Sequence, residues 1–183
     1  MRGEPGTLSG CPVFMKKGII LVIAAAALIA ALAFIPVHVL QIDALKEGSP
    51  VFVRIVRPGN EFALGFIHSV ELSPVWDYFR VDDSYRIILY ETAIRSFNTG
   101  LPSTLTGEER LHRERDGYRI SGINRVLPSI DLWVHERTDN TLKVKDDSLK
   151  LYSLAGNTLL KISIRKTRLG EYLYLRMYTT RVS

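Results

Sequence analysis

Cysteine is almost absent from this 183-residue sequence: the one cysteine, Cys11, stands ahead of a long apolar segment. Residues 12–183 can therefore form neither a disulfide with one another nor a thiolate metal site. Their fold has to be held by an apolar core alone. A domain of about 150 residues buries roughly 68–70% of its unfolded surface, which is enough for stability without such links.

The sequence also lacks a strong excess of one charge. It has 24 lysines and arginines against 19 aspartates and glutamates. Three of the basic residues and one of the acidic ones precede Gly18, which leaves 21 against 18 in the rest of the chain. Nucleic-acid-binding proteins concentrate lysine and arginine on one face. The mild and evenly spread excess here argues against a nucleic-acid partner.

Long segments with a helical period are missing after Pro36. Short β-branched and aromatic runs recur instead, separated by turn residues. We therefore predict an all-β domain over residues 37–183, an antiparallel β-sandwich or barrel-like meander. The expected strands are 51–56, 61–70, 75–81, 85–92, 131–137, 141–145, 149–154, 159–166 and 171–179.

The middle of this domain departs from the strand pattern. Residues 96–128 are rich in glycine, proline, serine and charge, with a short strand signal only at 118–120. A long irregular insertion in a compact domain is usually functional or disordered. We predict an irregular insertion over 96–128, in which Thr106 and Glu109 could cap a brief helical turn.

One segment is apolar without interruption. Residues 18–35 carry no charge, and Lys16 and Lys17 precede them. As a helix this run rises ~27 Å, about the hydrocarbon thickness of a bilayer. The lysines predict residues 1–17 as a short cytoplasmic tail. Residues 18–36 are then a transmembrane helix, a single-pass anchor in the cell membrane with the β domain outside the cytoplasm.

Alternatives to an uncleaved anchor stay open. A signal peptide could be cut after residues 31–33, Ala-Leu-Ala, which would release a secreted or periplasmic domain. The anchor is favoured because the run is longer than the usual signal core. A buried helix of a soluble protein fits the flanking lysines less well. Residues 15–17, Met-Lys-Lys, resemble a signal start, so Met1 and Met15 both remain candidates for the first residue.

The stretch Gly65–Phe79 sets polar side chains into an apolar run. If residues 71–74 form a four-residue turn, an antiparallel hairpin places His68 opposite Asp77 on an otherwise apolar face. Such a pair must be hydrogen-bonded, since an unpaired buried polar group costs ~1–3 kcal/mol. The opposite face would carry Ser69, Glu71, Trp76, Tyr78 and Arg80.

This hairpin geometry argues against catalysis. Ser69 points away from His68, whereas nucleophilic catalysis needs serine and histidine in contact. His68 and Glu71 lack the helical i, i+4 spacing of a metalloprotease site. We therefore predict no catalytic residue, no metal and no cofactor, and we do not expect an enzyme. A structural polar pair and a binding pocket remain as alternatives, with a hydrolase using His68 the least favoured.

Two motifs resemble a known family. The sequence reads HSVELSPVWDYF from His68 to Phe79 and NTGLP from Asn98 to Pro102. These runs are similar to the exported domains of unknown function that are often encoded beside TRAP transporters of the TAXI type. Members show a His-Ser-Val-Glu run, an acidic residue after Pro-Val or Pro-Trp, and a Gly-Ala-Gly-(Leu or Met)-Pro turn. Asn98 replaces the first glycine here, and the similarity covers about residues 61–128.

The resemblance implies a location and a neighbourhood, and it does not imply a reaction. The first hypothesis is a membrane-tethered accessory protein that contacts a TRAP permease or its solute-binding protein. The second is a small-molecule binding or sensing module. The hypothetical binding residues are His68, Ser69, Glu71, Asp77, Gly100, Leu101 and Pro102.

Overall fold

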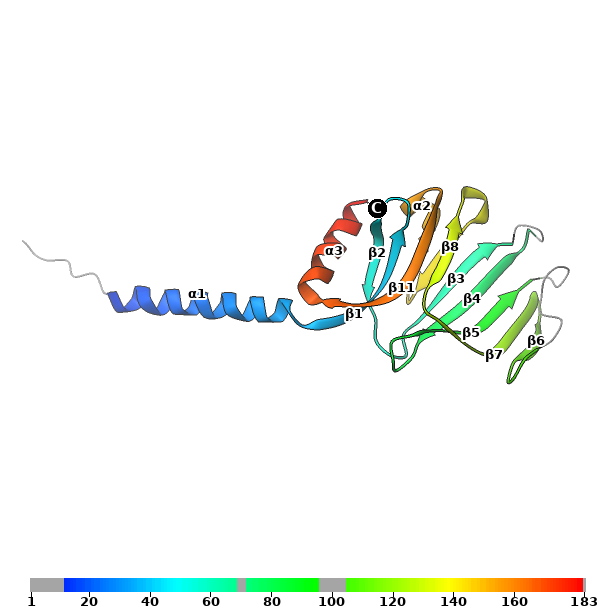
Figure 1. Cartoon of the computed structure of the whole chain (residues 1–183), viewed down its shortest axis with the longest axis horizontal. Helices are drawn as coiled ribbons and strands as arrows, with labels where there is room; N and C mark the ends of the chain where they lie inside the picture. The colour runs from blue at the N-terminus through cyan, green and yellow to red at the C-terminus, as the bar shows by residue number, and fades with distance from the viewer. Residues whose placement is uncertain (1–11, 69–71, 96–104, 183) are drawn as a thin grey trace, which may run out of the picture.

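A computed structural model describes residues 12–68, 72–95 and 105–182. The chain begins with helix α1 (Pro12–Ala33), which extends away from a β domain that starts at Pro36 (Figure 1). Among the described residues, no helix combines the length and the apolar character needed to cross a membrane.

Two antiparallel sheets make up the β domain. The four-stranded sheet has the order β2-β1-β11-β8, and the seven-stranded sheet has the order β10-β9-β3-β4-β5-β7-β6. The all-β, antiparallel prediction is confirmed. The strands are β1 (Pro36–Ala44), β2 (Ser49–Ile55), β3 (Glu61–Ile67), β4 (Pro74–Val81), β5 (Ile87–Ile94), β6 (Arg110–Glu114), β7 (Gly117–Leu127), β8 (Ile130–Val134), β9 (Thr141–Val144), β10 (Asp147–Lys150) and β11 (Thr158–Arg168).

The main core lies between the two sheets. Leu40 and Ile162 of the four-stranded sheet are fully buried in the same cluster as Leu64, Phe79 and residues of β9. In β11, buried Leu160 and Ile162 flank exposed Lys161, as expected for sheets that pack face to face. The sandwich form of the prediction therefore describes the domain better than a closed barrel.

One expected strand is helical, and another is helical in part. Residues 171–179 were predicted as a strand, but they lie in helix α3 (Leu169–Val182), which packs on the outer face of the four-stranded sheet. The run predicted over 149–154 divides between β10 and the short helix α2 (Leu151–Ala155). Aromatic and leucine residues suit either structure in a short run, so periodicity alone does not separate them.

The described part of the expected insertion is mostly strand. Residues 96–104 lie outside the described residues, but β6 and β7 pair as a hairpin at the edge of the seven-stranded sheet. The prediction of an irregular segment over 96–128 is wrong for this part. Every residue of β6 is exposed, so this strand carries none of the apolar alternation that marks a half-buried one.

The register of the β3–β4 hairpin also differs from the prediction. Asp77 pairs with Leu64, and Phe66 pairs with Val75, so His68 is not opposite Asp77. The strands separate earlier than expected, and the backbone N–H of His68 donates to the carbonyl of Ser73 at 2.9 Å. This hydrogen bond continues the β3–β4 register, so the connection lies two residues earlier in the chain than the expected turn at 71–74. The same residues still share a face, because the register shift is even.

Candidate functional site

The structure brings together few of the predicted binding residues. Ser69, Glu71, Gly100, Leu101 and Pro102 lie outside the described residues. His68 and Asp77 are described, and they are not strand partners. The expected His68–Asp77 pair is therefore wrong, and the two residues have to be considered separately.

Asp77 points into the sandwich and finds its partner on β5. The Thr92 hydroxyl donates to Asp77 Oδ1 at 2.8 Å, and the two residues are neighbours across β4 and β5. Burial raises the pKa of the Asp77 carboxyl above its ordinary value, while the Thr92 hydrogen bond and the Arg125 charge act in the opposite direction. Asp77 is thus a satisfied polar group at the edge of the core.

His68 lies in the connection after β3. Its backbone N–H and carbonyl are both used, by Ser73 and by the N–H of Leu72. Leu72 has a positive φ of 50° and an exposed side chain. The histidine is half-buried, so its position fits a tight connection better than the apolar face on which it was expected.

The outer face of β4 carries an indole ring that lies on the neighbouring strand. Gly65 on β3 pairs with Trp76, and a Cβ atom at Gly65 would lie 2.7 Å from the indole ring. Glycine at this position therefore allows the ring to lie against the strand. Lys143 Nζ of β9 lies 4.1 Å from the centre of the same ring, a cation–π contact.

Two tyrosines continue this row of aromatic rings. Tyr78 of β4 lies 6.4 Å from Tyr90 of β5, measured between ring centres. Tyr90 lies at a bulge of β5, between Leu89 and Glu91. Arg80 lies over the Tyr90 ring at 5.8 Å. Burial, together with nearby Glu61 and Glu91, raises the pKa of Tyr90 to about 12, so its hydroxyl stays protonated.

An ion network borders the tyrosines. Arg119 of β7 lies over the Tyr78 ring at 5.6 Å and pairs with both Glu91 and Glu114. The Arg119 contact lowers the pKa of Glu114, because the guanidinium stabilises the ionised carboxyl. We call the surface formed by Trp76, Tyr78, Tyr90, Arg80, Arg119 and Lys143 the aromatic face.

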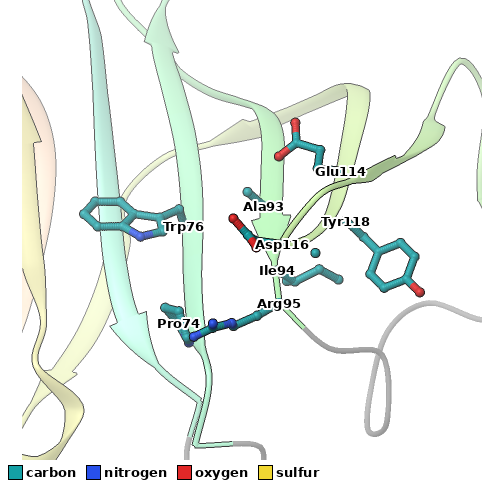
Figure 2. Close-up of a pocket in the computed structure, with 9 residues that line it drawn as sticks. Pro74, Trp76, Ala93, Ile94, Arg95, Glu114, Asp116 and Tyr118 are labelled. Atoms are coloured by element: carbon teal, nitrogen blue, oxygen red, sulfur yellow. The ribbon is translucent and has the colours of Figure 1, made fainter.

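A pocket of about 360 Å³ opens beside the aromatic face (Figure 2). Trp76 and Pro74 of β4 line one side, and the β6–β7 turn lines the other with Glu114 and Asp116. Arg95, which follows β5, adds a cation. An aromatic wall with charges of both signs suits a ligand or peptide segment that has an apolar part and polar ends.

The chemistry of these groups favours binding. No group of three or more potential metal-ligand side chains occurs within residues 12–68, 72–95 and 105–182. Aromatic rings with arginine are enriched at protein interfaces, where they supply large contact areas at low entropic cost. The aromatic face and its pocket therefore form the best-defined candidate binding surface in the described chain.

The family comparison falls on the part of the chain that carries this surface. Residues 62–151 match the family model of a domain of unknown function, DUF1850. The DUF1850 match runs from β3 to the first residue of α2, and it includes Trp76, Tyr78, Tyr90 and Arg119. No curated protein matches the chain, and no solved structure does.

The sequence pointed to only part of the aromatic face. Hairpin alternation placed Trp76, Tyr78 and Arg80 on one face, and the described strands confirm this grouping. Tyr90, Arg119 and the lysine of β9 were missed. Tyr90 lies on β5, and the other two lie on strands far away in the sequence, so reasoning from the β3–β4 hairpin could not include them.

Proposed function

We propose that this chain is a membrane-tethered extracytoplasmic accessory protein of a TRAP-type (TAXI) solute uptake system. Residues 18–36 tether it, and the aromatic face docks the permease or its solute-binding protein. The chain acts by binding and not as an enzyme. The aromatic face is the observation that carries the docking part of the proposal.

The composition of the aromatic face supports protein docking. Trp76, Tyr78 and Tyr90 are each half-exposed, and each has a cation over its ring or beside it. Packing against strands and cations fixes the rings, so a partner would lose little side-chain entropy on binding them. Rigid aromatic side chains of this kind dominate the binding energy of many interfaces.

The surface of α1 supports the tether. Its large apolar side chains are exposed, with Leu21 at 72% and Ile29 at 68% of full exposure. Exposed apolar surface costs about 25 cal/mol per Å² in water, so lipid contact would stabilise this helix. The lysines ahead of residue 18 are consistent with an N-terminus on the cytoplasmic side.

Sequence similarity supports the proposed association with a TAXI-type transporter. The HSVELSPVWDYF and NTGLP motifs resemble the exported domains encoded beside TAXI-type transporters, and the DUF1850 match over residues 62–151 spans both motifs. The resemblance suggests the partner class, and the aromatic face suggests where that partner binds.

A pull-down tests the proposal. The tagged full-length chain is cross-linked mildly in its native membranes, and the captured proteins and the intact mass of the bait are measured together. We expect a TRAP permease or solute-binding protein, with a bait mass that retains residues 18–36. Capture of neither protein overturns the partner, and a bait that begins after residue 33 overturns the tether.

The two tryptophans provide a matched pair of variants. Trp76→Ala removes the centre of the aromatic face and should reduce partner recovery by roughly tenfold or more, as expected for an interface anchor. Trp133→Ala changes the other tryptophan, which is 60% exposed on β8 of the four-stranded sheet. We expect recovery to be unchanged in that variant. Equal losses in both would contradict docking on the aromatic face.

A small-molecule module is the second candidate, because the pocket beside Trp76 is large enough for a small ligand. Its lining differs from the polar pocket around His68 predicted from the sequence, since Pro74, Trp76, Arg95 and the β6–β7 turn form its walls. A thermal-shift screen with small organic acids and amino acids would favour this candidate if a compound stabilises the wild type but not Trp76→Ala.

A further inference from the structure

Helix α3 has apolar or aromatic side chains on two opposite faces. One face packs on the four-stranded sheet, where Tyr172 is 5% exposed in a cluster with Val39 and Val53. Thr179, two turns further on, is also buried. A helix that is apolar on both sides is usually covered on both sides.

The opposite face of α3 is uncovered in the described chain. Leu173, Tyr174, Met177 and Tyr178 are 49%, 64%, 61% and 46% exposed. Residues three and four apart share a helix face, so these four side chains form one continuous stripe. Four adjacent large side chains form a patch, which indicates an interaction site more strongly than scattered single residues do. We call this stripe the α3 face.

The α3 helix begins beside the end of α1. The backbone N–H of Leu169 donates to the carbonyl of Ile35 at 2.8 Å, and a Cβ atom at Gly170 would lie 3.1 Å from that of Ala33. Figure 1 shows α3 on the side of the β domain from which α1 leaves, running across the direction of α1. A membrane that α1 enters would therefore run along the length of α3.

Two basic side chains lie close to α3, one before its first turn and one on the strand beneath it. Arg168 ends β11 and lies 4.9 Å over the ring of Phe34, which follows α1. Arg165 is exposed and pairs with Val39, the residue on which α3 packs. In the part of the chain that the structure describes, neither arginine forms an ion pair. Their charge complements the headgroups of anionic lipids.

We propose that the α3 face lies in the interface of a bilayer that contains anionic lipid, with Arg165 and Arg168 at the headgroups. Tyrosine suits this layer because its ring is apolar and its hydroxyl reaches water. Arginine suits it because the long stem lies along apolar surface while the charge stays in the headgroup region. This inference rests on the proposed tether, and it adds a second contact that fixes how the β domain stands on the membrane.

Quenching of a fluorophore tests the contact. The full-length chain with Cys11→Ser is reconstituted into vesicles of phosphatidylcholine and phosphatidylglycerol. A single cysteine in place of Tyr174 carries an environment-sensitive fluorophore. The matched control labels position 111 instead, because Leu111 is 44% exposed on β6, at the far end of the β domain (Figure 1). A third sample, labelled at Met177, checks that the result does not depend on one position.

We expect nitroxide-bearing lipid to quench the labels at 174 and 177 several-fold more than the label at 111. Iodide in solution should quench in the reverse order. In vesicles of phosphatidylcholine alone, or with Arg165→Glu and Arg168→Glu together, the lipid quenching at 174 should fall, because the charge attraction is lost.

The other outcomes separate the two proposals. A chain that does not float with the vesicles overturns the tether and this inference together. A chain that floats while label 174 stays open to iodide overturns the lipid contact and leaves the tether standing. Label 174 shielded from iodide without lipid quenching indicates a second copy or another protein on the α3 face, which also overturns the lipid contact.

Discussion

Asp77 illustrates what single residues of this sequence reveal. An acidic side chain on an apolar strand face needs a hydrogen-bond partner, and Asp77 has one. The partner is Thr92 of β5 and not His68 of the preceding strand. The need for a partner can be predicted from the sequence. Its identity depends on which strand lies alongside, which the hairpin motif does not specify.

The burial of Asp77 makes stability depend on pH. Its pKa is raised in the folded state, so its contribution to stability is full below the unfolded value of about 3.9 and is lost as pH rises through the folded value. Asp77→Asn removes the charge and keeps a carbonyl that can accept from Thr92. We expect the variant to melt a few degrees higher than wild type near neutral pH. The difference should vanish as pH falls to about 4, measured by thermal melts across this range.

Thr92→Val provides the matched comparison for Asp77→Asn. It removes the hydroxyl that donates to Asp77 and keeps the side-chain shape. We expect a loss of about 1.5–3 kcal/mol in unfolding free energy near neutral pH, as for a hydrogen bond to a charged group. The loss should be smaller in the Asp77→Asn background. A difference between wild type and Asp77→Asn that does not change with pH would show that ionisation of the Asp77 carboxyl does not affect stability.

At the scale of elements, apolar alternation predicted most of the half-buried strands, but it missed the buried β1 and the exposed β6. Leu160, Ile162 and Ile164 alternate with polar residues, and they lie in β11 as expected. The exposed β6 carries no such pattern, so the β6–β7 hairpin was missed. The α3 segment was assigned to a strand because leucine and tyrosine are compatible with either period, and the sheet on which α3 packs decides the outcome.

The β3–β4 register can be tested directly. Ala63 and Tyr78 are a non-hydrogen-bonded pair of the β3–β4 ladder. At such a pair the Cβ atoms of the two residues lie close enough for a disulfide. In a Cys11→Ser background, Ala63→Cys with Tyr78→Cys should form an internal disulfide on mild oxidation, detected by the mass of the linked peptides. Ala63→Cys with Asp82→Cys matches the register expected from a turn at residues 71–74. Preferential linkage of that second pair would contradict the observed register.

At the scale of the whole molecule, the two proposed contacts belong to different sheets. The four-stranded sheet carries α3 and lies beside the end of α1, where the membrane contact is proposed. The seven-stranded sheet carries the aromatic face and lies almost wholly within the DUF1850 match, which also includes β8 of the other sheet. The sandwich core joins them. The chain can thus hold one sheet at a surface while the other presents rigid aromatic rings to a partner.

Photo-cross-linking from one position tests docking on the aromatic face most directly. A photoreactive phenylalanine analogue replaces Tyr78 in the full-length chain in its native membranes, and the same analogue replaces Trp133 as the control on the other sheet. We predict a covalent product with a TRAP permease or solute-binding protein from position 78 and none from position 133. No product from position 78, or the same product from both positions, would contradict the account.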